Sequence, residues 1–171
     1  MATPFSDDDE QDSEDQDFDQ ADAIDLLSDD HMEVQQLFQD YETLVDEKAD
    51  AAERETLARE ICALLTIHTQ IEEEIFYPAA QEVLDTDDLV DDALAEHAQA
   101  KQLIAAIEAS SANDKGYDER VSQLGEAINQ HVRHEEETLF VRVTHAGLDL
   151  QDVGRQLFDR REELLADLDA D

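Results

Sequence analysis

The chain has 171 residues, of which 48 are acidic and 11 are basic, so its formal net charge at neutral pH is -37. A surface of this charge repels the phosphates of nucleic acid and the headgroups of anionic lipid, whereas it attracts divalent cations. No apolar run is long enough to cross a membrane, and the N-terminus has no recognisable signal peptide. We therefore expect a cytoplasmic protein with no membrane or nucleic-acid partner.

Acidic side chains dominate the first 21 residues, which contain few apolar ones. Such a segment buries too little apolar surface to offset the conformational entropy lost on folding, so residues 1–21 are predicted to form a disordered acidic tail. Residues 22–171 are long and hydrophobic enough to form one folded domain. We expect its core over about 22–145 and an additional C-terminal helix over about 149–168.

After the tail, apolar residues recur at alternating steps of three and four, which is the period of an amphipathic helix. The first helix is predicted over residues 24–45. The second should begin after Asp50, which has the spacing of a capping box with Glu53, and it should end or bend at Pro78.

A third helix is predicted to begin after Thr86 and to end at the turn formed by residues 113–116, and a fourth should cover about 121–140. No segment alternates with a period of two, so we predict an all-α fold, namely an up-down four-helix bundle followed by a fifth helix. The apolar seams of the first four helices each include one histidine: His31, His68, His97 and His131.

Two of these histidines are followed four residues later by a glutamate, as His68-x-x-x-Glu72 and His131-x-x-x-Glu135. On a helix this spacing leaves the two side chains about 40° apart around the axis and roughly 6 Å apart along it, so both face the same neighbour. The acidic residues directly after each glutamate point elsewhere on a regular helix. The spacing therefore selects one glutamate from each pair.

The two halves of the domain resemble each other in sequence. Residues 31–37 align with 97–103, and residues 68–77 align with 131–140. Each half is predicted to form a helical hairpin with the same polar side chains, and packing the hairpins together brings four imidazoles and two carboxylates into one core.

A single histidine in an apolar seam is usually a hydrogen-bonded core residue. Six such donors in duplicate are harder to explain in that way, because two buried glutamates without a counter-charge cost several kcal/mol or must stay protonated. A bound cation provides the missing compensation. The predicted metal ligands are His31, His68, Glu72, His97, His131 and Glu135.

The remaining polar and aromatic residues near these motifs have simpler interpretations. We expect Cys62 to be a packed thiol that forms no disulfide, and Tyr77 and Phe140 to be packing residues. His134 should be exposed or hydrogen-bonded, and His145 should lie at the C-terminal end of a helix, where a positive imidazole is favourable.

The order H…HxxxE…H…HxxxE, with a second glutamate after each HxxxE, resembles the hemerythrin-like HHE cation-binding domain over residues 22–145. The resemblance implies two iron ions joined by an oxo or hydroxo group. One partition gives each iron two histidines, with Glu72 and Glu135 bridging the pair, but the sequence does not assign individual histidines. Mixed imidazole and carboxylate donors also admit manganese or zinc.

Two departures from oxygen-carrying hemerythrins bear on function. Lys101 lies where the resemblance would place a second histidine four residues after His97, and Glu135 comes four residues after its histidine where carriers have an aspartate five residues after. We therefore expect a protein that binds or responds to O2, peroxide or NO in sensing or stress response. The alternatives are a di-iron enzyme that disproportionates peroxide or reduces NO, and a bundle that buffers iron or binds zinc. The sequence identifies no protein partner.

Overall fold

The computed structural model describes residues 21–170, so the disorder predicted for residues 1–21 falls, except at Ala21, outside the described part. The described part consists of helices and their connections and contains no strand, which confirms the all-α prediction. The α-helices are α1 Ala23–Asp46, α2 Ala51–Ile71, α3 Tyr77–Val83, α4 Asp88–Glu108, α5 Tyr117–His134, α6 Phe140–His145 and α7 Leu150–Ala170.

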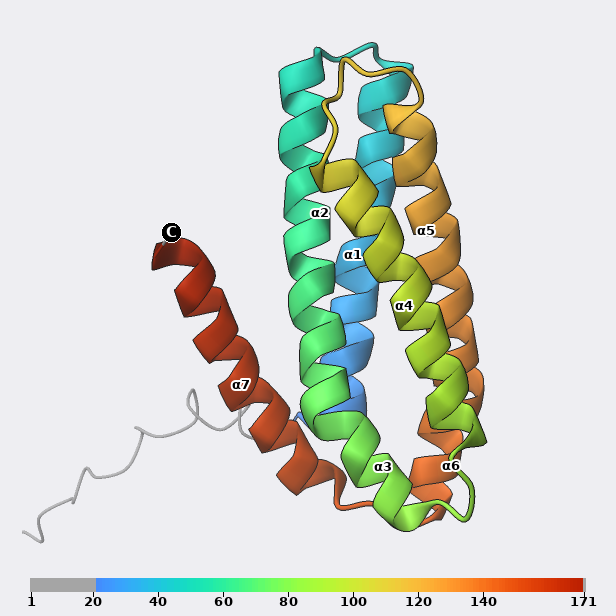
Figure 1. The fold of residues 1–171 in the computed structure, drawn as a ribbon. Coiled ribbons are helices and arrows are strands. Elements are labelled where there is room, and N and C mark those ends of the chain that lie inside the picture. The colour runs from blue at the N-terminus through green and yellow to red at the C-terminus, as the bar shows by residue number, and fades with distance from the viewer. Residues whose placement is uncertain (1–20, 171) are drawn as a thin grey trace, which may run out of the picture.

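Helices α1, α2, α4 and α5 form a four-helix bundle, and α7 lies diagonally against one side of it (Figure 1). The contacts of α7 are with α1, α2 and the segment after α2. These contacts confirm the predicted bundle with a fifth helix. None of the described helices is both long enough and apolar enough to cross a membrane.

Side-chain caps and one glycine set the ends of these helices. Asp22 and Asp25 form a reciprocal capping box at the start of α1, and the carboxylate of Asp50 accepts a hydrogen bond from the backbone N–H of Glu53 at 2.9 Å. Gly116 has a φ of 85°, which favours glycine, in the turn before α5. The predicted turn at 113–116 therefore connects the second hairpin.

Two short π-helical segments interrupt the long helices at equivalent places in the two halves. They are η1 Glu72–Phe76, between α2 and α3, and η2 Glu135–Leu139, between α5 and α6. Each begins at the glutamate of an HxxxE motif, and π-turns of this kind are frequent at functional sites. Pro78 does not end the second helix, because it lies in the first turn of α3, where helical hydrogen bonds do not require its missing N–H. The helical path therefore continues to Val83.

The apolar core is divided into two clusters with a polar layer between them. One cluster, here called the loop-side cluster because it extends to the connection between α4 and α5, includes Val34 and Leu65. The other, here called the α7-side cluster because it contains residues of α7, includes Leu27 and Ile71. His31 lies in sequence between Leu27 and Val34 on α1, so its position in the seam falls where one cluster gives way to the other. The helical period that builds the core thus also places the histidines inside it.

Helix α7 approaches the start of α1 closely at Gly154. A β-carbon added at Gly154 would lie 2.8 Å from the backbone nitrogen of Ala23 and 2.9 Å from the carbonyl carbon of Asp22. Because backbone atoms cannot yield as a flexible side chain can, this contact requires glycine. Val153 and Leu157, on either side of it, are buried in the α7-side cluster.

Gly154→Ala is therefore expected to destabilise the protein, although alanine normally stabilises a helix interior relative to glycine by roughly 0.5–1 kcal/mol. Overpacking against backbone should cost about 1–3 kcal/mol. Urea unfolding would measure the change, with the exposed Asp159→Ala on the same helix as control. A Gly154→Ala variant as stable as the parent would show that α7 does not dock in this way.

Candidate metal centre

The six predicted ligands come from four helical segments and lie together in the polar layer between the two apolar clusters. His31 lies on α1, His68 on α2 and His97 on α4, and His131 lies on α5. Glu72 and Glu135 are the first residues of η1 and η2. All six side chains are buried, and Glu72 has no exposed surface.

The six residues form two groups that share both carboxylates. One group contains His31 and His68 with the two glutamates, and the other contains His97 and His131 with the same glutamates. Within each group the potential ligand atoms all lie within 4.8 Å of one another. Each hairpin therefore supplies one histidine pair, which divides the histidines in a way that the sequence alone left open.

Each glutamate reaches across from one group to the other. Glu135 Oε1 lies 3.3 Å from His31 Nε2, and Glu135 Oε2 lies 3.4 Å from His131 Nε2. Glu72 Oε1 is in direct contact with His68 Nε2 and lies 3.8 Å from His97 Nε2. Both carboxylates therefore lie within reach of a cation at either group.

Imidazole nitrogens also face each other within the groups. The Nε2 atoms of His31 and His68 are 3.2 Å apart, as are those of His97 and His131. Two neutral imidazoles that face each other in this way can form only one hydrogen bond with each other. Nitrogens that carry no proton and converge on one point are instead arranged like the ligands of a metal ion.

The buried carboxylates lack the compensation that such groups need. Neither oxygen of Glu72 accepts a hydrogen bond of ordinary geometry from the described residues. Burial, together with the nearby charge of Glu135, raises the pKa of Glu72 well above its usual value. Burial also opposes ionisation of Glu135, but its close contacts with His131 and His31 outweigh burial and lower the pKa of that carboxyl. A divalent cation at either group would compensate both carboxylates, so these residues fit a metal pair.

Acidic side chains hold the outer nitrogens of these histidines. The Nδ1 of His31 lies 3.0 Å from Glu136, and the Nδ1 of His97 lies 3.2 Å from Glu73. Such carboxylates fix the ring orientation and tautomer of a metal-binding histidine.

A carboxylate also lies near the outer nitrogen of His68 and of His131, within hydrogen-bond distance at His68 and farther away at His131. His68 Nδ1 lies 3.1 Å from Asp30, and His131 Nδ1 lies 3.7 Å from Glu96. Asp30 and Glu96 directly precede His31 and His97 in sequence. The pattern therefore repeats across the two halves, as the duplicated sequence does.

The contacts of Glu73 and Glu136 were not predicted, because a regular helix directs these residues away from their own motif histidine. They do point elsewhere, but each contacts a histidine of the other hairpin. The repeated Glu-Glu pair in both halves was the available signal.

Positively charged or polar side chains stabilise this outer layer of carboxylates. Lys101 Nζ lies 2.6 Å and 2.8 Å from the oxygens of Glu73. Arg161, on α7, lies 2.7 Å from Asp30. His134 is exposed and contacts Glu96 at 3.2 Å, which confirms the interpretation given to it from sequence.

Tyr77 is more than a packing residue, contrary to the sequence-based interpretation. Its buried hydroxyl donates a hydrogen bond to Glu135 Oε2 at 2.6 Å and lies 3.0 Å from His97 Nε2. Burial and the two neighbouring glutamates raise the pKa of Tyr77 well above its usual value. Phe140 lies at the equivalent place in the second half and stacks on His31 at a centroid distance of 6.0 Å. A hydroxyl therefore faces the histidines of one group and a bare ring faces those of the other.

The other interpretations from sequence agree with the structure. Cys62 is buried in the loop-side cluster, and burial raises the pKa of its thiol to about 12, as expected for an inert packed residue. His145 is the last residue of α6, just before Gly147, which has a φ of 80°.

Three comparisons place the chain among known proteins. The family model "Hemerythrin HHE cation binding domain" matches residues 22–143. A protein of Nostoc sp. (strain PCC 7120 / SAG 25.82 / UTEX 2576) described as a DNA nickase is 32% identical over 122 residues, which cover 70% of this chain and 32% of that protein. The chain thus spans about a third of the length of this curated relative.

Among solved structures, a hemerythrin HHE cation binding domain-containing protein from Mycobacterium kansasii has a TM-score of 0.68 at 21% identity, covering 84% of this chain and 87% of the other. This similarity concerns the fold. Together with the match to the family model over residues 22–143, it shows that the chain belongs to the hemerythrin HHE cation-binding domain family.

Proposed function

We propose that the protein binds two iron ions, joined by an oxo or hydroxo group, between its two helical hairpins. The observation that carries this proposal is the pair of buried ligand groups that share both carboxylates. Each ion would have two histidines from one hairpin, and both ions would share the carboxylates. The proposed ligands are His31, His68, Glu72, His97, His131 and Glu135.

The donor set fits iron, and it also admits manganese or zinc. Imidazole suits iron, copper, nickel and zinc, and carboxylate also suits manganese and magnesium. When bound, an iron pair supplies one-electron redox chemistry and open coordination positions for small molecules. The chain contributes the geometry, the carboxylates that orient the imidazoles, and the Tyr77 hydroxyl.

The proposed role is to bind or respond to O2, peroxide or NO in sensing or stress response. Reversible oxygen carriage is disfavoured by Lys101, which has a half-exposed side chain that pairs with Glu73 and adds no ligand to the polar layer. The alternatives are a di-iron enzyme that turns over peroxide or NO, and a bundle that stores iron or binds zinc. All use the same residues.

The name of the Nostoc relative does not extend this proposal to DNA. The similarity covers only a third of that protein, and the acidic excess of this chain repels a phosphate backbone. We expect no direct nucleic-acid partner.

The test is the metal content and optical spectrum of the protein purified from its own cells, recorded before and after O2, peroxide and NO. The proposal predicts iron, and oxidation of the reduced protein by O2 without a long-lived oxygenated spectrum. A stable, reversible oxygenated spectrum would support a carrier. If the protein contains zinc and no iron, and its spectrum does not respond to O2, peroxide or NO, the result would support a bundle that binds zinc. Peroxide turnover that disappears on metal removal would favour the enzyme.

A further prediction concerns Arg161, which connects α7 to the centre through Asp30 and His68. Arg161→Met should remove the positive charge that holds the Asp30 carboxylate, loosen the orientation of His68, and weaken metal binding by about 10–100-fold. Competition with a chelator would measure the affinity. Arg155→Met is the control, since Arg155 is on the same helix and pairs only with exposed Asp152 in the described structure. Equal affinities in the two variants would contradict this role.

A further inference from the structure

The two groups of the centre are alike in their ligands but not in what covers them. Helix α7 packs against α1, α2 and η1, which carry His31, His68 and Glu72. Leu157 of α7 is fully buried and belongs to the same apolar cluster as Leu27 and Ile71. The side of the bundle next to His31 and His68 is therefore closed by a helix.

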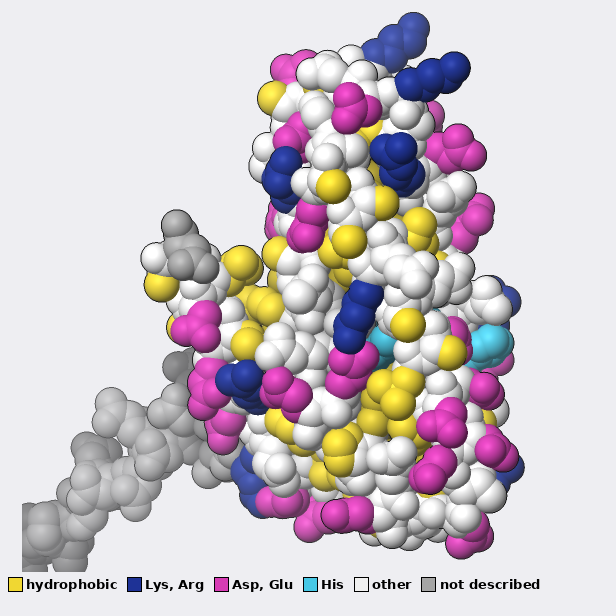
Figure 2. Space-filling model, viewed as in Figure 1, with side chains coloured by type: hydrophobic (Ala, Val, Ile, Leu, Met, Phe, Trp, Pro, Cys, Tyr) yellow, Lys and Arg dark blue, Asp and Glu magenta, His cyan; other side chains and the backbone are white. Residues whose placement is uncertain are grey.

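The corresponding side of the second half is open. A cavity of about 210 Å³ lies between α4 and the end of α5 with η2, and it extends to His131 and Glu135. Figure 2 shows histidine side chains among acidic and hydrophobic ones on the face that includes α4. The remaining walls of the cavity are Leu89, Asp92, Ala93, Glu96, His134, Thr138 and Leu139.

The sequence repeat explains the difference between the sides. Aligning His31 with His97 places Leu27 opposite Ala93, and aligning His68 with His131 places Ile71 and Ile75 opposite His134 and Thr138. The first half therefore has larger or more apolar side chains, which pack in the α7-side cluster. The second half has smaller or polar ones, and they line a space that reaches the centre.

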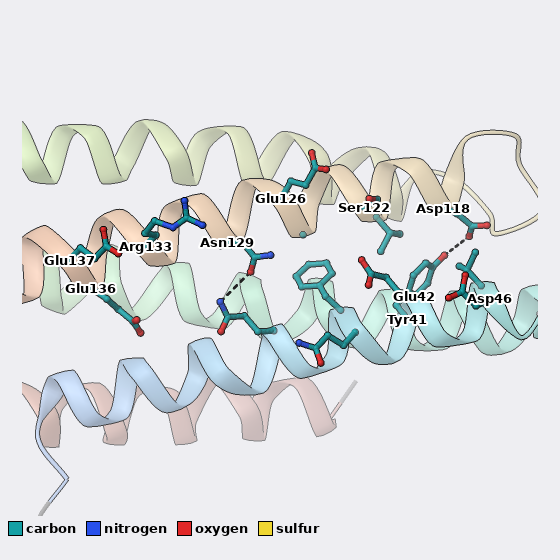
Figure 3. A pocket seen from close by; sticks show the side chains of 16 residues that line it. Tyr41, Glu42, Asp46, Asp118, Ser122, Glu126, Asn129, Arg133, Glu136 and Glu137 are labelled. Atoms are coloured by element: carbon teal, nitrogen blue, oxygen red, sulfur yellow. Dashed lines mark hydrogen bonds between the residues drawn. The ribbon is translucent and has the colours of Figure 1, made fainter.

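Two other spaces lie near the centre, but they give a small molecule poorer access to the six proposed ligands. A groove of about 930 Å³ between α1 and α5 ends at Glu136 and Glu137 and has none of the six proposed ligands in its lining (Figure 3). Glu136 contacts the outer nitrogen of His31, Nδ1, at 3.0 Å. A void that touches His31, His68 and His131 has a volume of about 10 Å³, which is at the lower limit for a single water.

We propose that small neutral molecules reach the centre through the cavity between α4 and η2 and bind on the side of His97 and His131. This inference rests on the proposed function, since it assigns an entry route to the same centre. The Tyr77 hydroxyl lies at this group and donates its hydrogen bond to Glu135 Oε2, so it orients a carboxylate that lines the cavity.

The chemistry of the cavity defines the class of molecule. Its volume of about 210 Å³ admits molecules of a few heavy atoms. Asp92 and Glu96 in its walls disfavour anions, whereas Leu89, Ala93 and Leu139 provide apolar contacts. A neutral molecule of two heavy atoms, such as a diatomic gas or hydrogen peroxide, fits these constraints.

The first experiment obstructs the cavity with tryptophan at exposed positions of its walls, Thr138→Trp on η2 and Asp92→Trp on α4. The probe is NO, mixed in a stopped-flow instrument with the reduced, iron-loaded full-length chain. We expect unchanged iron content and an association rate lowered by about tenfold or more in both variants. Arg142→Trp is the matched control, because Arg142 is exposed on α6 and does not line the cavity.

The result that overturns the proposal is an equal NO association rate in Thr138→Trp, Asp92→Trp and Arg142→Trp. A chain that binds no iron would instead contradict the proposed function, and a second readout tests the route without metal. Crystals of the metal-free protein under xenon pressure should show xenon in the cavity, and crystals of Thr138→Trp should not. Absence of xenon from the parent cavity would overturn the proposed route even if iron binds.

Discussion

Glu72→Ala is expected to remove both metal ions, because this carboxylate belongs to both ligand groups. The purified parent should contain about two irons per chain, and loss of a bridging ligand should weaken both positions. His68→Ala removes a ligand from one group only, so it should lower the iron content less than Glu72→Ala does. Metal analysis of protein loaded under identical conditions would measure these differences.

His145→Ala is the control for this series. His145 lies on α6 and belongs to neither ligand group, so its variant should keep the iron content of the parent. Equal iron content in Glu72→Ala, His68→Ala and His145→Ala would show that the buried groups do not bind the metal.

Glu72→Met should make the metal-free protein more stable, although it removes a proposed ligand. Glu72 is fully buried, and the burial that raises its pKa destabilises its charged form. Replacing this buried carboxyl, which accepts no hydrogen bond of ordinary geometry, with an apolar side chain of similar volume removes its desolvation cost and is expected to stabilise the metal-free fold by about 1–3 kcal/mol. Chemical denaturation of the metal-free variant and parent would measure the difference.

Iron should reverse this order of stability. An ion that binds only the folded parent stabilises it by mass action, whereas Glu72→Met should gain little. Glu137→Met provides the control, since Glu137 is exposed on η2 and belongs to neither group. If Glu72→Met is less stable than the metal-free parent, then the buried carboxylate is stabilised by the protein alone and no cation is needed to explain it.

The sequence was sufficient to predict the bundle and the six proposed ligands because both depend on helical periodicity. His31 and His97 occupy seam positions that the three-and-four spacing brings inside, and the four-residue interval places Glu72 beside His68. The repeat between the halves then indicated that the two hairpins face each other. These features require only regular helix geometry.

The features that sequence did not predict depend on departures from regular helices and on contacts between distant segments. A constant rotation per residue cannot reveal the π-turns that begin at Glu72 and Glu135, or the contact that Glu73 makes with the other hairpin. The position of α7 depends on the packing of Gly154 against α1, and the role of Arg161 depends on that position. The sequence indicated only a packing role for Tyr77, because Glu135, which accepts a hydrogen bond from its hydroxyl, is 58 residues away.

The most direct test of the proposed metal centre is an anomalous difference map from iron-loaded crystals, recorded on both sides of the iron absorption edge. A shared two-metal centre predicts two iron peaks in the polar layer, one beside His31 and His68 and the other beside His97 and His131, with Glu72 between them. A single peak, or iron outside this layer, would contradict the assignment of a shared two-metal centre.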